Sequence, residues 1–403
     1  MEEWKEYKLI DVCEVINGRA YKQEELLEEG KYRVLRVGNI FQGNNWYYSD
    51  IELPEDKYCY DGDLLYAWSC GFAPYIWKGE KTIYHYHIWK LKECKEVVDR
   101  KFLYYYLIVN TKRFLGGTHG SVMLHLTKRE MEEQLLRLPS LSTQHQIASI
   151  LSSLDDKIEV NRRINENLEQ QAQALFKSWF VDFEPFKNGE FVESELGMIP
   201  KGWRVGTLGE YCKVRSGFAF KSTWWTNEGV PVIKIKNITD NGNLEMLDCS
   251  FVSKEHAALA KEFQTIEGDL LIAMTGATIG KFCIVHDNSK YCVNQRVGKF
   301  FLGDEPLKKL PFIFLNLKQS SVHDEIINRG QGSAQPNISG GDIETLKVVI
   351  APDVVISNFN VMLYPSFKKM ISNQQESRRL AELRDTLLPK LMSGELKVCD
   401  IVL

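Results

Sequence analysis

The chain contains the same segment twice, about half its length apart. Residues that start at Trp4 and residues that start at Trp203 share a spaced pattern at an offset of 203 − 4 = 199 positions. Farther along, Gly62–Leu65 matches Gly268–Leu271, and Gly120-Ser121 matches Gly332-Ser333. The matched pairs of the first segment are Trp4/Trp203, Leu9/Leu208, Cys13/Cys212, Val15/Val214, Gly18/Gly217, Ala20/Ala219, Lys22/Lys221, Gly30/Gly229 and, after a one-residue deletion, Asn39/Asn237.

This period limits the possible architectures. Solenoid repeats use roughly 20–50 residues, so a repeat of this length indicates two similar domains, each able to bury its own core. The two copies have either diverged in role or perform one task twice about a pseudo-two-fold axis. The segments between the copies decide between these alternatives.

Each copy begins as an α/β domain. Short apolar runs bounded by glycine-rich or polar turns predict strands at Val34–Val37 and Asp63–Ala67 in the first copy. The corresponding runs of the second copy are Val232–Ile235 and Asp269–Ala273. The fold class is therefore expected to be α/β.

A long helix is predicted after the first copy. It follows Pro139, has a capping-box pattern at Thr143–Gln146 and ends near Phe180, which corresponds to about 57 Å at 1.5 Å per residue. Steps of four and three residues indicate a coiled-coil seam. In that seam, Asn161 and Asn165 are either tolerated or specify register, and we weigh these alternatives equally. The seam residues are Ile147, Leu151, Leu154, Ile158, Asn161, Asn165, Leu168, Ala172 and Leu175.

A second long helix is predicted from about Pro365 to Met392, ending at Gly394. Its stripe is Leu380, Leu383, Leu387 and Leu391. Two such helices would bury their apolar stripes as an antiparallel pair. The predicted domains are residues 1–141, a helix at 142–181, an aperiodic linker at 182–202, a second domain at 203–356, and a helix with a tail at 357–403.

Two similar domains on a helical spacer suit the recognition of two separated stretches of one DNA duplex. Both copies carry side chains that suit contacts to base edges or phosphates at matching places, and glycine beside serine or threonine lets backbone N–H groups approach a phosphate. Taken singly, each is more often a solvated side chain or a turn residue. The candidates are Arg19, Lys22, Arg33, Arg36, Asn39, Trp68, Ser69, His85, His87 and Ser121 in the first copy, and Arg215, Lys221, Lys234, Lys236, Asn237, Thr275, Gly276, Gln295, Arg296 and Ser333 in the second.

Net charge, cysteine spacing and the length of apolar runs limit which kinds of protein this chain can be. The net charge is −4, so DNA binding would depend on local patches and on help from partner proteins. The 9 cysteines include no C-x-x-C pair, which argues against a disulfide framework and a zinc site. No apolar run reaches the ~20 residues of a membrane span, and the acidic start is unlike a signal peptide. We expect a cytoplasmic protein without a metal or cofactor.

Four longer segments resemble one family, the specificity subunits of type I restriction–modification systems. They are Thr143–Glu159, Leu175–Pro185, Glu195–Trp203 and Leu383–Leu396. The resemblance implies two target-recognition domains in inverted orientation, separated by two long antiparallel helices. Each domain would read one half of a bipartite site in double-stranded DNA, and the helices would dock two modification subunits and, through them, restriction subunits. One segment, Ala351–Ser357, departs from the form of Ser142–Gln146, which implies weaker or asymmetric helix-end packing or docking there.

Two other classes of function are compatible with parts of the sequence. The chain has no phosphate-binding loop, no Asn-Pro-Pro-aromatic tetrapeptide and no H-E-x-x-H motif, so we expect a non-catalytic subunit. Asp155-Asp156-Lys157 lies on the predicted helix and is interpreted as a solvated face. The second alternative is a coiled-coil scaffold that does not bind DNA, which the acidic composition favours. Binding to a duplex that weakens steeply with salt would exclude it.

Overall fold

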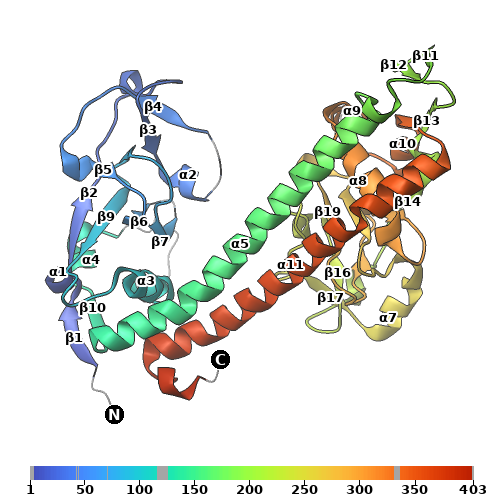
Figure 1. Cartoon of the computed structure of the whole chain (residues 1–403). Coiled ribbons are helices and arrows are strands. Elements are labelled where there is room, and N and C mark those ends of the chain that lie inside the picture. The colour runs from blue at the N-terminus through green and yellow to red at the C-terminus, as the bar shows by residue number, and fades with distance from the viewer. Residues whose placement is uncertain are drawn as a thin grey trace. The chain divides into compact units, whose positions relative to one another are not determined.

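The computed structural model describes residues 4–41, 43, 45–69, 71–115, 126–330 and 336–401. It divides into two compact units (Figure 1). Unit 1 comprises Met1–Lys157 and Leu380–Leu403, and unit 2 comprises Ile158–Arg379. Each unit therefore holds one copy of the repeat and a part of both long helices. In the described part of the chain, no helix is long and apolar enough to cross a membrane.

The described residues of unit 1 form three sheets. The first is antiparallel in the order β2-β9-β6-β7, with β2 Cys13–Asn17, β6 Leu64–Trp68, β7 Phe72–Ile76 and β9 Ile88–Glu93. The second has the order β4-β3-β8-β5, with β3 Tyr32–Leu35, β4 Tyr47–Ser49, β5 Tyr58–Cys59 and β8 Thr82–Tyr84. The third pairs β1 Lys5–Lys8 with β10 Leu135–Leu138. The helices are α1 Leu9–Val12, α2 Val37–Phe41, α3 Arg100–Phe114 and α4 Lys128–Glu132.

Unit 2 repeats this arrangement. Its antiparallel sheet has the order β14-β21-β18-β19, with β14 Lys213–Ser216, β18 Leu270–Ala273, β19 Phe282–Ile284 and β21 Val297–Phe301. A second sheet joins β15 Trp225–Thr226, β17 Ser250–Val252, β16 Val230–Ile233 and β20 Cys292–Val293. Strand β13 Arg204–Thr207 pairs with β22 Lys347–Ile350. The helices are α6 Leu208–Tyr211, α7 Lys254–Leu259, α8 Leu310–Leu317, α9 Ser320–Gly330 and α10 Gly340–Glu344.

The predicted strands are confirmed at their centres and corrected at their ends. Val37 starts helix α2 and Ile235 starts a 3-10 helix, although both were predicted to be strand residues. The cause is the asparagine two residues farther along. Asn39 Oδ1 accepts a hydrogen bond from Arg36 N, and Asn237 Oδ1 accepts one from Lys234 N, both at 2.9 Å. These bonds close a turn and end the strand.

Two long helices complete the fold, α5 at Leu141–Phe180 and α11 at Asp353–Ser393. The predicted start of α11 at Pro365 is wrong by about three turns, because Ile356, Phe359 and Leu363 are buried in the unit 2 core and stabilise an earlier start. The predicted end is confirmed, since Gly394 follows α11 with a left-handed φ of +76°.

The start of α5 also differs from the prediction. The helix begins at Leu141, so Thr143 lies inside its first turn and is not the N-cap residue of a capping box. Ser140 Oγ accepts a hydrogen bond from Thr143 N at 3.3 Å and takes the capping role.

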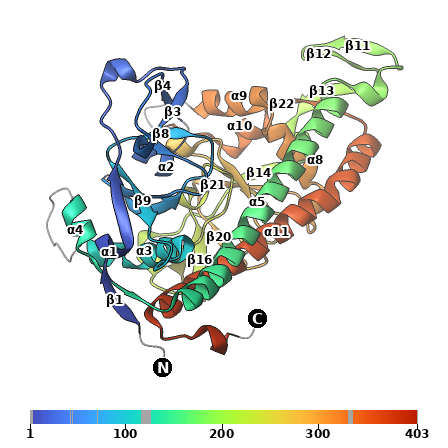
Figure 2. The ribbon, with the colours of Figure 1, turned by 60° about the vertical axis from the view of Figure 1, so that its left-hand side comes forward.

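Within each unit the two long helices pair antiparallel. In unit 2, Asn161 Nδ2 donates to Glu376 Oε2 at 2.8 Å, and Asn165 Nδ2 donates to the earlier residue Met370 O at 3.0 Å, while α5 and α11 lie side by side in both views (Figures 1 and 2). Asn373 Nδ2 also donates to Asn165 Oδ1 at 2.8 Å. Both seam asparagines therefore face the partner helix, which favours a role in register.

The leucine and isoleucine positions of the predicted seam divide into three groups. Ile147, Leu151 and Leu391 are buried in the unit 1 core, and Leu387 packs against that core. Leu383 is 44% exposed, so its assignment to the seam was wrong. The others are buried or half-buried, namely Leu154, Ile158, Leu168, Leu175 and Leu380.

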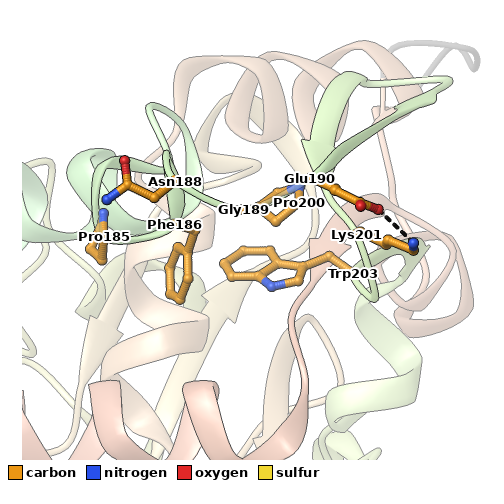
Figure 3. Close-up of a pocket in the computed structure, with 8 residues that line it drawn as sticks. All are labelled: Pro185, Phe186, Asn188, Gly189, Glu190, Pro200, Lys201 and Trp203. Atoms are coloured by element: carbon orange, nitrogen blue, oxygen red, sulfur yellow. Dashed lines mark hydrogen bonds and ion pairs between the residues drawn. The ribbon is translucent and has the colours of Figure 1, made fainter.

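The segment expected to be an aperiodic linker is ordered. It contains a 3-10 helix at Glu184–Phe186 and an antiparallel hairpin of β11 Phe191–Ser194 and β12 Gly197–Pro200, seen near the end of α5 in Figure 2. Phe183 and Trp203 are buried in the unit 2 core, so aromatic packing holds the segment. A hollow of about 500 Å³ lies beside Trp203, and its eight lining residues are drawn in Figure 3. None of these eight was a predicted DNA contact.

Candidate nucleic-acid interface

A three-residue turn recurs at the same place in both units. Turn 1 is His85–His87, between β8 and β9, and turn 2 is Asn294–Arg296, between β20 and β21. In unit 1, six backbone hydrogen bonds of 2.9–3.2 Å hold turn 1. From N–H donor to carbonyl acceptor they are Gly18 to Ile88, Arg19 to Tyr84, Trp68 to His87, His85 to Leu35, Tyr86 to Arg19 and Ile88 to His85. In unit 2, six equivalent hydrogen bonds of 2.8–3.0 Å hold turn 2. They are Gly217 to Val297, Phe218 to Val293, Met274 to Arg296, Asn294 to Ile233, Gln295 to Phe218 and Val297 to Asn294. The two turns therefore share one backbone frame.

This frame explains why one glycine recurs. A Cβ atom on Gly18 would lie 2.3 Å from the carbonyl oxygen of His85, and a Cβ atom on Gly217 would lie 2.3 Å from that of Val293. No side chain fits at such a distance, so both positions require glycine for close backbone approach. The repeated glycine found in the sequence thus supports the turn of each unit.

The side chains on turn 1 are aromatic. Its three rings contact one another, with centroids 4.4 Å apart for His85 and Tyr86 and 3.9 Å apart for Tyr86 and His87. Trp68 lies 5.2 Å from His87, and its indole N–H donates to Tyr86 O at 2.8 Å. Burial lowers the pKa of His85 to about 4, and the charges of His87 and Arg36 act in the same direction. A neutral imidazole can donate one hydrogen bond and accept another.

The basic candidates of unit 1 mostly have partners of their own. Arg19 donates to both carboxylate oxygens of Glu25, at 2.7 and 3.0 Å. Arg33 lies 3.4 Å from Glu80, and Lys22 lies 3.7 Å from Glu24. Arg36 is exposed and lies over the ring of Tyr47 at 5.1 Å, so its charge is the most available of the four.

The side chains on turn 2 are polar and lie beside a hollow. The hollow has a volume of about 590 Å³. It collects three predicted residues, Thr275, Gln295 and Arg296, from two places in the sequence. Its lining is Ser216, Met274, Thr275, Gln295, Arg296, Asn337, Ile338 and Ser339. Ser216, Asn337 and Ser339 were not predicted, because only the fold brings them to turn 2.

The other basic candidates of unit 2 each contact a neighbouring side chain. Arg215 forms an ion pair with Glu262, and Lys236 forms one with Asp248 at 2.6 Å. Lys234 donates to Ser250 Oγ at 2.7 Å and lies 3.7 Å from the Trp225 ring, and burial lowers its pKa. Lys221 is exposed and lies 5.3 Å from the Trp224 ring.

Several candidates have internal roles instead. Asn237 is 3% exposed and also donates to Glu245 O at 2.8 Å, so its amide is used inside the turn and the predicted DNA contact is wrong. Asn39 closes the equivalent turn and donates to Asn45 O. Ser69 is buried, and Gly276 supports its turn with a φ of +69°. Ser121 and Ser333 lie outside the described residues.

The chemistry available at both turns is hydrogen bonding and stacking. Among the described residues, no group of three or more histidine, cysteine or acidic side chains is placed to hold a metal ion. The turns resemble each other in backbone and differ in side chain, which is the property expected of two readers of different base sequences.

Comparisons with known proteins identify the family. The model of the type I restriction modification DNA specificity domain matches residues 1–170 and 200–354. The MjaIX specificity subunit of Methanocaldococcus jannaschii is 31% identical over 316 residues, which cover 76% of this chain and 71% of that protein. The HindI specificity subunit of Haemophilus influenzae is 23% identical over 98% of this chain and 100% of that protein.

A solved structure agrees on the fold. The S subunit of a type I restriction–modification system from M. genitalium has a TM-score of 0.59 at 18% identity, covering 97% of this chain and 96% of that chain. The predicted α/β fold with two similar domains and two long helices is thereby confirmed. The family match and the similar specificity subunits do not favour the scaffold alternative. The chain therefore belongs to the DNA specificity subunits of type I restriction–modification systems, the non-catalytic subunits that give these systems their DNA target.

Proposed function

We propose that each unit reads one half of a bipartite target in double-stranded DNA, unit 1 through turn 1 and unit 2 through turn 2. The observation that carries this proposal is the shared backbone frame with different side chains, His85-Tyr86-His87 in one unit and Asn294-Gln295-Arg296 in the other. Base edges are read by side chains held in a fixed position, so one frame with two side-chain sets suits two different half-sites.

In this proposal the domains keep the limits expected from the sequence. Residues 1–141 and 203–356 are the target-recognition domains, residues 142–181 and 357–403 supply the helices, and residues 182–202 connect them. Because α11 begins at Asp353, the second boundary falls within the first turn of that helix.

The basic side chains outside the turns would contact phosphates. Arg19, Arg33, Arg215 and Lys236 form surface ion pairs with neighbouring acids. Surface ion pairs contribute little to stability, so they exchange readily for phosphate contacts. Because acids compete for these cations, we expect weak binding by the isolated chain and stronger binding in complex with partner proteins.

We further propose that the helix pair docks two modification subunits and, through them, restriction subunits. The exposed apolar residues Val160 and Ile164, one turn apart on α5, support a protein partner on the helices. The proposed target is DNA inside the cell, which supports the cytoplasmic location expected from the sequence.

Methylation mapping tests the proposal. Genomic DNA would be mapped in cells that express the chain with its modification subunit and in cells that lack only the chain. We expect a split motif of two short half-sites that is lost without the chain. Replacement of residues 203–356 by the same region of a relative should change one half-site and keep the other.

A binding measurement distinguishes the alternatives. The purified assembly should bind a duplex with the split motif, with an affinity that falls steeply as salt rises. If the assembly shows no chain-dependent motif and no salt-dependent binding to DNA, the scaffold alternative is supported instead.

A further inference from the structure

The hollow beside turn 2 contains an unused hydrogen-bonding group. Thr275 Oγ1 is buried and has no hydrogen-bond partner within the described residues. Buried hydroxyl groups are nearly always paired, so an unpaired one in a surface hollow points to a ligand with polar groups. None of the eight lining residues is acidic, although the chain as a whole has a net charge of −4. The hollow therefore suits a ligand with hydrogen-bond acceptors.

Arg296 supplies the positive charge of this hollow. It is exposed, and in the described part of the chain no acidic side chain pairs with it. Arg215 and Lys236, in the same domain, are each neutralised by an acid. An unpaired guanidinium on an acidic protein remains free for a ligand.

The backbone of Arg296 is held in place. Its carbonyl oxygen accepts a hydrogen bond from Met274 N at 3.0 Å, and its N–H donates to Asn294 Oδ1 at 3.4 Å. The preceding residue, Gln295, donates its N–H to Phe218 O at 3.0 Å. A fixed backbone limits the positions that the guanidinium can reach, which favours discrimination between ligands.

The neighbours of Arg296 suit a base edge. Gln295 and Asn337 bring two amide side chains to the hollow, and Thr275 brings a hydroxyl. Amide side chains can pair with base edges through two hydrogen bonds, and Arg296 is the one cation among the eight lining residues. Arginine matches the O6 and N7 acceptors of guanine with two parallel hydrogen bonds.

We propose that Arg296 specifies a G·C pair, through the guanine edge in the major groove, in the half-site that unit 2 reads. This inference rests on the proposed function and adds a base and a residue to it. Unit 1 has His87 at the equivalent place, packed 5.2 Å from Trp68, and so makes no equivalent arginine contact. The guanine contact belongs to one half-site only.

The test compares Arg296→Ala and Arg296→Lys with Lys254→Ala, an exposed charge on α7 of the same domain outside the proposed interface. Each chain would be assembled with its modification subunit. Methylation motifs would be mapped in cells, and binding would be measured on duplexes that vary every base pair of both half-sites, at several salt concentrations.

We expect the parent motif to contain a G·C pair in the half-site that changes when residues 203–356 are replaced. Arg296→Ala should reduce the preference for that pair by about 5- to 150-fold, the range for a lost bidentate contact, and leave the other half-site unchanged. Arg296→Lys should retain part of the preference, and Lys254→Ala should retain all of it.

Two results would overturn the assignment of Arg296. One is an unchanged motif in Arg296→Ala. The other is equal weakening on all sequences with a salt slope reduced by about one, because that is the behaviour of a phosphate contact. A parent chain with no motif at all would instead overturn the proposed function, and the inference with it.

Discussion

Gln144 holds the recognition domain of unit 1 to helix α5. Its side chain is 1% exposed. Its Oε1 accepts a hydrogen bond from Asp99 N at 2.9 Å, and its Nε2 donates to Val97 O and Pro139 O, each at 3.0 Å. Asp99 is the N-cap residue of α3, so one amide connects the start of α3 with the start of α5. We predict that Gln144→Ala destabilises unit 1.

The magnitude follows from these contacts. Each hydrogen bond contributes about 0.5–1.5 kcal/mol net, so three contribute about 1.5–4.5 kcal/mol. Alanine is the better helix former by a few tenths of a kcal/mol, which offsets little. The expected loss is therefore about 3 kcal/mol of unfolding free energy for unit 1.

Gln146→Ala is the matched control. Gln146 is two residues away on the same helix, is exposed, and forms no side-chain hydrogen bond within the described residues. The assay is urea unfolding combined with hydrogen exchange of peptides from α3, which should lose protection in Gln144→Ala alone. Unfolding free energies of the two variants within about 0.5 kcal/mol of each other would refute the reasoning.

Three further predictions follow from the fold. Gly217→Ala places a Cβ atom 2.3 Å from Val293 O, so in duplex-binding assays it should abolish discrimination between bases in the unit 2 half-site only. The control Gly38→Ala, whose Cβ atom meets nothing within 4 Å, should bind normally. Equal binding by the two variants would contradict the shared backbone frame. The His85 imidazole should titrate in nuclear magnetic resonance spectra with a midpoint near pH 4. Because its pKa is lowered in the folded protein, the contribution of His85 to stability should be lost as the pH falls from 6.5 towards 4. A midpoint near 6.5 would disprove its burial. Lys299 lies 2.7 Å from the 2% exposed carboxylate of Asp269, so Lys299→Met should lower the unfolding free energy by roughly 3–5 kcal/mol at pH 7.5. The loss should shrink at pH 5, because burial raises the pKa of Asp269 and lets it take up a proton, and an equal loss at both pH values would argue against an uncompensated buried charge.

Much of the fold was predictable from patterns that are local or periodic. The repeat identified two similar domains, and the heptad spacing identified helix α5, although the helix begins before the predicted cap at Thr143. Gly394 was recognised as the end of α11, since few other residues adopt a left-handed φ there. The turn sequences were also singled out, because they differ between the copies where the surrounding sequence is shared.

The candidate site was predictable only in outline. Asn39 and Asn237 have the residue type of base readers, yet they cap turns, because the backbone N–H groups of Arg36 and Lys234 lie within reach. Conversely, nothing near turn 2 in the sequence indicates Asn337, which lies about forty residues farther along and reaches the hollow through the fold. Residue type suggests a contact, whereas neighbours decide whether the side chain is free to make it.

The two domains, the two long helices and the two turns can be recognised from spacing along the chain alone. Which side chains on those elements are free depends on the folded arrangement. Arg215 is paired with Glu262, and among the described residues no acid pairs with Arg296, although both are exposed arginines of one domain. The physical reason is that an ion pair or a buried hydrogen bond depends on distances of a few ångströms between residues that the sequence separates widely.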